Sequence, residues 1–384
     1  MNVTVSANGR FWAFELAAQL HRRGHLRRLV TSYPRFVADR YNVPVDRVKS
    51  IVVHEVATRA WGRTPARLRL ALNAQPAFSE SFDRVAARYI PNDTQIFVGW
   101  SGVSERGLAR SRGLGAVTVL ERGSTHIEVQ RDILREEYAR WGSRGELPHP
   151  RIVEKELREY QTADYIVVPS EFVRLSFLRK GVDPSKMLRI PFGVDVVDFA
   201  PPPERQRDVF RLIYAGSMSL RKGLPYLLQA FSELRLPRAE LWLVGRCLPE
   251  IEPFLRRYEG SFRHIPAVPQ RELPGLYAQC SAFILCSLEE GFALVLPQAM
   301  ASGLPVVCTE NTGAKDVVQD GREGFILPIR DVSALKERIQ YLYEHPEERE
   351  EMGRAARRAV KSGLTWNDYG DRVAAAYENI LARS

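Results

Sequence analysis

The stretch Ser287–Thr309, SLEEGFALVLPQAMASGLPVVCT, combines two carboxylates, a glycine, an apolar helical pattern and a buried-strand pattern. Pro297 fits the first turn of a helix, where its missing N–H costs little, and we predict a helix over residues 293–300. The run LPVVCT (304–309) is typical of a strand that is buried on both faces. The stretch therefore predicts one unit of a parallel α/β sheet. Its carboxylates belong either to a surface turn before a core helix or to a ligand pocket at a strand end.

The same rhythm of apolar runs and amphipathic segments extends over the whole chain. It predicts strands at residues 2–7, 26–32, 95–100, 116–123, 165–170, 212–217, 241–245, 282–287 and 304–309. Near-continuous apolar strands that alternate with helices indicate parallel sheets covered on both faces. The first helix is expected over residues 11–23, ended by Gly24. The fold class is therefore α/β, with parallel sheets covered on both faces.

A change of composition divides the chain into two halves. The segment FGVDVVDFAPPPERQRD (192–208) has three consecutive prolines followed by charged residues, which is typical of a linker. We predict an N-terminal domain over residues 1–195 and a C-terminal domain over 196–365. An amphipathic helix over 366–384 is expected to pack back toward the N-terminal domain. Two domains of this kind would face each other across a cleft.

The charge of the 384-residue chain is unevenly distributed. Residues 1–190 contain 31 Lys and Arg against 20 Asp and Glu, whereas the remainder is slightly acidic, so the formal net charge of +9 arises in the first half. This asymmetry indicates either an anionic partner or dispersed surface arginines. The segment RAWGRTPARLRLALN (59–73) would suit an anionic membrane surface as a helix, or a core-packed helix with solvated arginines. We expect no nucleic-acid partner.

Several classes of protein are disfavoured by what the sequence lacks. There is no apolar run of membrane-spanning length and no secretory leader pattern. The four cysteines show neither disulfide-like nor metal-ligating spacing. We therefore expect a cytoplasmic protein, located in part at the inner face of the cell membrane, without a metal site.

Polar and charged residues follow the predicted strands at the point where ligands bind to parallel sheets. In AGSMSLRKG (215–223), Arg221 and Lys222 precede a helix, and Gly223 permits a tight turn. Two cations beside the free N–H groups of a helix suit a diphosphate, and a solvated basic turn is the alternative. In the second loop, Glu290 could accept hydrogen bonds from sugar hydroxyls, and Gly291 lets a ligand approach the backbone.

Five motifs in sequence order resemble those of one enzyme family. They are ADYIVVPSEFVRLSFLRKGVDPSKMLRIPFGVD (163–195), YAGSMSLRKG (214–223), EGFALVLPQAMASGLPVV (290–307), DVVQDGREGFILP (316–328) and LTWNDYGDRVAAAYENIL (364–381). The chain resembles the retaining nucleotide-sugar glycosyltransferases of family 4, also called group 1. The resemblance implies the GT-B architecture, in which two Rossmann-like doubly wound domains face a cleft. The resemblance covers nearly all of the C-terminal half and covers the N-terminal half thinly.

The resemblance implies roles for individual residues. Glu290 would face the hydroxyls of the donor sugar, and Lys222 would neutralise the diphosphate leaving group. Gln298 occupies the position of a second Glu that holds ribose hydroxyls in the family, and its amide can make similar hydrogen bonds. The implied catalytic residues are Glu290 and His126, and the implied donor-binding residues are Gly9, Ser217, Arg221, Lys222, Gly291, Phe292, Ala293, Leu294, Val295 and Gln298.

This sequence departs from the family pattern in two places besides residue 298, and it matches the pattern at His126. Ser217 stands where many relatives have Arg, a charge that Arg221 could supply from another turn. Gly9 is a single glycine where relatives often have two. His126, in ERGSTHIEVQ (121–130), follows a strand at a position where the family often has a His near the reacting carbon, and a loop histidine without chemistry is the alternative.

The expected activity is transfer of a sugar from a UDP- or GDP-linked donor to an acceptor hydroxyl, with retention of configuration and without a metal or other cofactor. The expected acceptor is a glycan or glycolipid, in cell-envelope or extracellular glycan synthesis. A nucleotide-sugar epimerase or phosphorylase of the same architecture stays open as an alternative, because fold does not fix function. A non-catalytic donor-binding subunit is the third possibility, suggested by Gln298 and Ser217.

Overall fold

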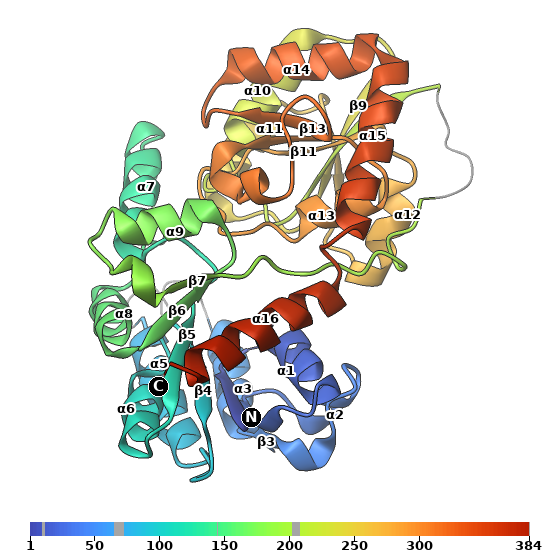
Figure 1. The fold of residues 1–384 in the computed structure, drawn as a ribbon. Coiled ribbons are helices and arrows are strands. Elements are labelled where there is room, and N and C mark those ends of the chain that lie inside the picture. Colours follow the sequence, from blue (N-terminus) through green and yellow to red (C-terminus); the bar gives the residue numbers. More distant parts are fainter. Residues whose placement is uncertain (10–11, 65–72, 144, 202–207, 384) are drawn as a thin grey trace.

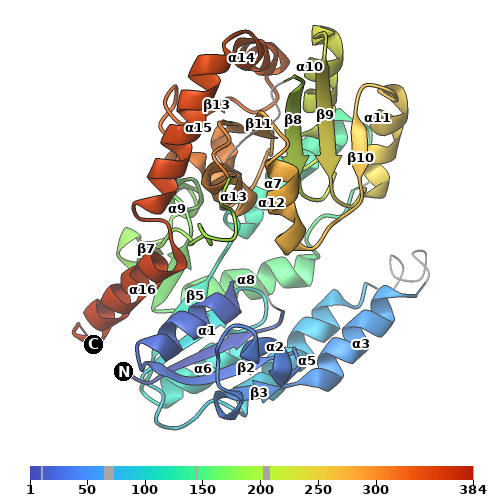
Figure 2. The same ribbon diagram turned by 90° about the vertical axis from the view of Figure 1, so that its right-hand side faces the viewer.

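The computed structural model describes residues 1–9, 12–64, 73–143, 145–201 and 208–383. Within these ranges the strands form two sheets, and every pair of neighbouring strands is parallel. The two sheets lie in separate halves of the molecule (Figures 1 and 2). The predicted fold class, two Rossmann-like α/β sheets, is confirmed.

The first sheet has the strand order β3-β2-β1-β4-β5-β6-β7. Its strands are β1 Val3–Ala7, β2 Leu26–Thr31, β3 Val48–Ser50, β4 Ile96–Trp100, β5 Val117–Glu121, β6 Tyr165–Val168 and β7 Met187–Arg189. The helices of this half are α1 Ala13–Arg22, α2 Arg35–Asp39, α3 Val52–Gly62, α5 Gln75–Ala87, α6 Glu105–Gly113, α7 Ile127–Arg140, α8 Pro150–Thr162 and α9 Glu171–Leu178. The strand order reverses direction between β1 and β4.

The second sheet has the order β10-β9-β8-β11-β12-β13 and reverses between β8 and β11. Its strands are β8 Phe210–Ala215, β9 Ala239–Val244, β10 Arg263–Ile265, β11 Ala282–Leu285, β12 Val306–Thr309 and β13 Gly324–Leu327. The accompanying helices are α10 Leu224–Leu234, α11 Glu252–Arg257, α12 Leu273–Tyr277, α13 Val295–Ala301, α14 Val332–Glu344 and α15 Pro346–Lys361. Ligands of such sheets bind outside the carboxyl ends of the strands at the reversal point.

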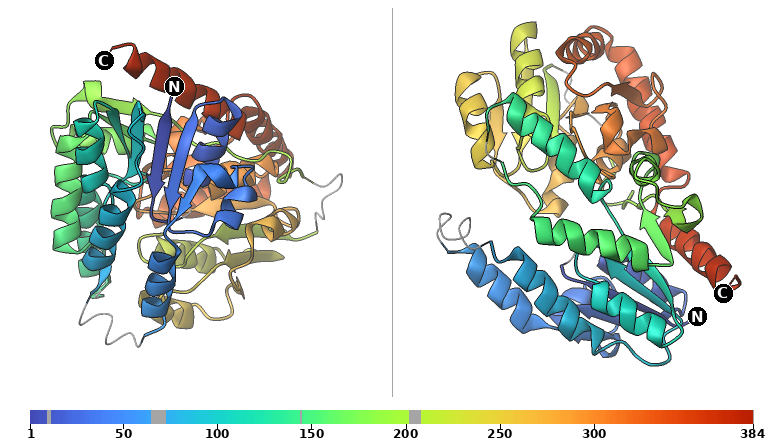
Figure 3. Two further views of the ribbon diagram at one scale, coloured as in Figure 1. Left: turned by 90° about the horizontal axis from the view of Figure 1, so that it is seen from below. Right: turned by 90° about the vertical axis from the view of Figure 1, so that its left-hand side faces the viewer.

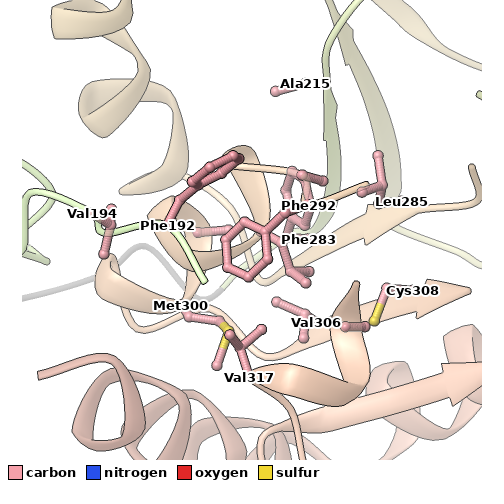
Figure 4. Packing of buried hydrophobic residues seen from close by; sticks show 14 of the residues in the cluster. Phe192, Val194, Ala215, Phe283, Leu285, Phe292, Met300, Val306, Cys308 and Val317 are labelled. Atoms are coloured by element: carbon pink, nitrogen blue, oxygen red, sulfur yellow. The ribbon is translucent and has the colours of Figure 1, made fainter. Parts of the chain in front are cut away.

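The core of the second half is formed by apolar side chains from the strands and from α13 (Figure 4). Phe283, Val306 and Met300 are fully buried. Phe192, from the segment between the sheets, packs edge-to-face on Phe292 of the β11–α13 loop, with ring centroids 5.5 Å apart. The loop that holds the predicted site residues is therefore anchored to the interdomain segment.

Among the described residues, no helix combines the length and apolar character needed to cross a membrane.

Helices cross from one half of the molecule to the other. The last helix, α16 Trp366–Leu381, begins at a capping box formed by Thr365 and Asp368 and packs on α1 of the first half (Figure 1). Arg23 of α1 pairs with Asp371 of α16 at 2.6 Å. In the opposite direction, α7 leaves the first sheet and lies along the second half (Figure 3). The domain boundaries given above stay a prediction.

Candidate functional site

The loops that follow β8 and β11 meet at the reversal point of the second sheet. Arg221 donates its Nε–H to the Glu289 carbonyl at 2.9 Å and forms an ion pair with the Glu289 carboxylate, with Nε 3.0 Å from Oε2. The backbone N–H of Leu288 donates to the Arg221 carbonyl at 2.8 Å. Lys222 forms an ion pair with Glu290. Two cations and two carboxylates that are far apart in sequence are thus held together where the fold places a ligand.

Two glycines make this close approach of the loops possible. Gly223 precedes α10 with φ +67°, and a Cβ at this position would collide with the carbonyl of Cys286. Gly291 lies against the first domain, because an added Cβ would collide with the carbonyl of Gly123. Only glycine fits both positions without a shift of the backbone.

The charges of this cluster depend on one another. Burial, together with Arg221, lowers the pKa of Lys222 to about 7, while Glu289 acts in the opposite direction. An anionic partner, either Glu290 or a bound phosphate, favours the protonated form of Lys222. Burial acts to raise the pKa of Glu289, but Arg221, the Thr125 amide, Gln130 and Arg122 together lower it. Glu289 is therefore an anion at neutral pH.

The first domain closes over the cluster through its β5–α7 loop. The N–H and hydroxyl of Thr125 donate to Glu289 Oε1 at 2.9 and 3.0 Å. From the loop before α9, Ser170 donates its hydroxyl to the Gly291 carbonyl at 2.5 Å. These contacts place the segment before α7 against the loop that contains Glu290.

The β1–α1 loop approaches the same region from the reversal point of the first sheet. Gly9 lies two residues after the end of β1 and has φ +125°. Trp12 donates its indole N–H to Glu121 at 3.1 Å, and an added Cβ at Gly123 would collide with the Trp12 ring. Burial raises the pKa of Glu121 to about 8, although the Trp12 hydrogen bond opposes the shift. Glu121 is thus protonated at neutral pH in the folded chain.

His126 is buried within the first domain, with 3% of its surface exposed. Its ring lies between Tyr160 and Phe177, with centroids 5.0 and 5.1 Å away. Its Nδ1 accepts from the Glu128 N–H at 3.4 Å and caps α7. Burial lowers the pKa of His126 to about 4. The side chain is neutral at pH 7, so any catalytic role would be that of an uncharged hydrogen-bonding group.

The remaining predicted residues differ in their environment. Gln298 lies in α13 with 6% of its surface exposed, and its Oε1 has no hydrogen-bond partner within the described part of the chain. The Ala293 N–H donates to the Thr312 carbonyl at 3.4 Å, and Leu294 and Val295 lie half-buried at the start of α13. Ser217 is exposed beyond β8, where its carbonyl accepts from the Tyr214 hydroxyl at 2.8 Å.

The structure brings together Arg221, Lys222, Glu290 and Gly291 at one point, whereas His126 and Gln298 are buried beside it. Sequence reasoning assigned no role to Glu289 or to its partners in the first domain. The two adjacent carboxylates in SLEEGF (287–292) were the available signal. If one of them is fully buried, it requires charged or polar partners.

Comparison with known proteins shows which family part of the chain resembles. Residues 199–359 match the family described as glycosyl transferases group 1. The match lies in the C-terminal half of the chain, where the sequence motifs resemble this family. The chain is 29% identical over 235 residues to a GDP-mannose-dependent alpha-(1-6)-phosphatidylinositol monomannoside mannosyltransferase of Mycolicibacterium smegmatis, a match that covers 55% of this chain and 61% of that protein.

Solved structures confirm the GT-B fold of the chain. Sucrose-phosphate synthase from Thermosynechococcus elongatus superimposes with a TM-score of 0.74 at 19% identity, over the full length of both chains. HepE of Anabaena, solved in complex with UDP, gives a TM-score of 0.69 at 15% identity and covers 99% of this chain and 100% of that one. In sequence, the chain spans about half the length of the curated relatives that it matches.

Proposed function

We propose that the protein is a retaining glycosyltransferase that moves a sugar from a nucleoside-diphosphate sugar to an acceptor hydroxyl. The observation that supports this most directly is the pairing of Arg221 and Lys222 with Glu289 and Glu290 at the reversal point of the second sheet. This is where an α/β sheet binds an anionic ligand, and the HepE structure contains UDP. The first domain would bind the acceptor.

The diphosphate, the sugar and the ribose of the donor each have a candidate partner in this arrangement. The diphosphate would replace Glu290 as the anionic partner of Lys222, and would thereby free the Glu290 carboxylate for the hydroxyls of the sugar. A ribose hydroxyl would supply the donor that Gln298 Oε1 lacks, because a buried acceptor without a partner costs about 1–3 kcal/mol. The backbone of residues 292–295 would approach the sugar and phosphate next to Gly291.

The proposed transfer balances without a protein nucleophile. The acceptor oxygen forms a bond to the anomeric carbon on the face from which the phosphate leaves, the bond from that carbon to the phosphate oxygen breaks, and the acceptor proton passes to a phosphate oxygen. Positive charge develops on the sugar, so Glu290 would stabilise the transition state more than the ground state. Arg221 and Lys222 would stabilise the negative charge on the departing diphosphate without a metal or other cofactor.

The acceptor is proposed to be a glycan or glycolipid at the inner face of the cell membrane, in cell-envelope or extracellular glycan synthesis. Exposed apolar side chains on α2 and α3 support contact with an anionic membrane. Phe36, Val53 and Val56 are 60%, 82% and 61% exposed, and the exposed Arg59 and Arg63 lie on or next to α3. The α3 helix ends at Gly62, and residues 65–72 of the segment predicted to lie on a membrane fall outside the described residues.

A screen of donors by thermal shift tests the proposal, because a ligand that binds the folded state raises the melting temperature by mass action. UDP, GDP and their sugars are expected to stabilise the protein, and the stabilising sugar nucleotide should be consumed only when an acceptor is added. Epimer formation without an acceptor would instead indicate an epimerase. Binding without turnover over a broad acceptor panel would indicate a donor-binding subunit. Turnover that is lost with EDTA would contradict metal independence.

A further inference from the structure

Glu289 links the two domains from a fully buried position. Its carboxylate has no exposed surface and is shared between the domains. Oε1 accepts both hydrogen bonds from Thr125, whereas Oε2 accepts from Gln130 Nε2 at 3.0 Å and forms the ion pair with Arg221, 3.0 Å from Nε. The residue thus joins the β5–α7 loop and α7 of the first domain to the basic loop after β8.

The contacts continue into the first domain as a chain of alternating charges. Gln130 Oε1 accepts from Arg122 Nη2 at 3.0 Å, and Arg122 pairs with Glu156 of α8 at 2.8 Å. The Ser101 and Tyr160 hydroxyls donate to Glu156, each at 2.6 Å. Charges of this kind are costly to bury unless they are paired and hydrogen-bonded, and here each one is. The position of Glu289 is therefore set by the interior of the first domain.

Arg221 transmits this position to the proposed donor site. Both of its contacts with residue 289 use Nε, so Glu289 leaves the terminal nitrogens of the guanidinium available. Lys222 follows directly and pairs with Glu290. A shift of Glu289 would therefore move both cations relative to the loop of the first domain, and misplacement by about 1 Å can lower a rate by about a hundredfold.

We propose that Glu289 is a positioning residue for sugar transfer, which fixes the basic loop at Arg221 and Lys222 relative to the acceptor-side loop at Thr125. The proposal rests on the proposed function. Because Glu289 is an anion next to an anion site, its neutralisation would not weaken diphosphate binding through charge. Its loss should lower the turnover number and leave the affinity for the donor largely intact.

A second buried carboxylate provides a matched control. Glu137 of α7 also has no exposed surface, pairs with Arg330 at 2.8 Å and accepts from the Tyr226 hydroxyl at 2.8 Å. It therefore joins α7 to the second domain through an arginine, as Glu289 does, but neither partner lies in the loops of the proposed site. Glu137→Gln measures the general cost of neutralising a buried interdomain carboxylate.

The experiment compares Glu289→Gln, Glu137→Gln and the wild type. In the wild type the Thr125 amide donates to a charged acceptor. Its hydrogen exchange should therefore become at least about tenfold faster in Glu289→Gln and stay unchanged in Glu137→Gln. With the donor found by the screen, kcat should fall at least about tenfold and KM should change less than about threefold. Glu137→Gln should keep kcat within about twofold. Unchanged kcat in Glu289→Gln, or an equal loss in Glu137→Gln, would overturn the proposal.

A milder variant covers the case in which Glu289→Gln does not fold. Thr125→Val removes one hydrogen bond to Glu289 and keeps the backbone N–H, so kcat should fall by a smaller factor, and an unchanged kcat would count against the proposal. If the double variant Glu289→Gln, Thr125→Val folds, its kcat should be no lower than that of Glu289→Gln alone, because both changes act on the same contact. If the wild type transfers no sugar, the proposed function fails, and the exchange comparison decides by itself whether Glu289 joins the domains.

Discussion

The burial of His126 makes a quantitative prediction about acid stability. The ring is enclosed by Tyr160 and Phe177, and burial lowers its pKa from 6.5 to about 4. Protons therefore bind this side chain more readily in the unfolded chain than in the folded one. The stability that His126 contributes is therefore present above pH 6.5 and is lost as the pH falls toward 4.

The two pKa values give the size of the effect. Each pKa unit corresponds to about 1.4 kcal/mol, so the loss between pH 7.5 and pH 5 amounts to about 2 kcal/mol of the free energy of unfolding. A residue that does not titrate removes this contribution. His126→Asn is suitable because Asn is a good N-cap and can replace Nδ1 as the acceptor for the Glu128 N–H.

Urea unfolding of the wild type and of His126→Asn, at pH 7.5 and at pH 5, measures the predicted difference. The variant is expected to be less stable at pH 7.5 because it loses aromatic packing, and to lose about 2 kcal/mol less than the wild type on acidification. His149→Asn controls for the change of capping residue, since His149 caps α8 from a half-exposed position through the same kind of contact, at 3.1 Å. Equal acid losses in the wild type and His126→Asn would refute the reasoning.

Three further predictions concern the donor site and the membrane face. Lys222→Ala should weaken UDP or GDP binding roughly ten- to hundredfold in calorimetry and leave the bare nucleoside nearly unchanged, and an equal loss of the nucleoside would contradict a phosphate role. Glu290→Gln should lower kcat more than donor affinity, whereas Gln298→Glu should keep kcat similar and shift donor affinity by about 1 kcal/mol; the reverse pattern in steady-state kinetics would rule out these roles. Vesicles of anionic lipid should sediment with the protein more than neutral ones do, and less so after Val53→Ser and Val56→Ser, while equal or absent sedimentation would remove the membrane contact.

The sequence predicted the long elements well because their patterns are strong. The apolar runs at 26–32 and 282–287 became β2 and β11 with their starting residues as predicted, and the helix expected over 11–23 became α1. Four short strands were not predicted, namely β3, β7, β10 and β13. Strands β3, β7 and β10 have only three residues each, too few to show a periodic pattern, so tertiary pairing decides their conformation.

The site was predictable only within one domain. Arg221 and Lys222 could be expected near Glu290, because both loops follow neighbouring strands at the reversal point of one sheet. The contact of Glu289 with Thr125 spans 164 residues and depends on how the two domains are oriented, which no local pattern encodes. The burial of His126 was missed for a related reason. Its cage comes from α8 and α9, which follow it in the chain and contain no signal that points to a histidine.

The chain passes between the domains twice, and the two passages lie side by side. Val194, on the way to the second domain, donates its N–H to the carbonyl of Leu364 at 2.8 Å and forms a bridge with Thr365, on the way back. Two tethers bonded to each other resist twisting and sliding more than they resist bending. Separation of the two domains should therefore occur as a hinge motion that bends both segments at Val194 and Thr365.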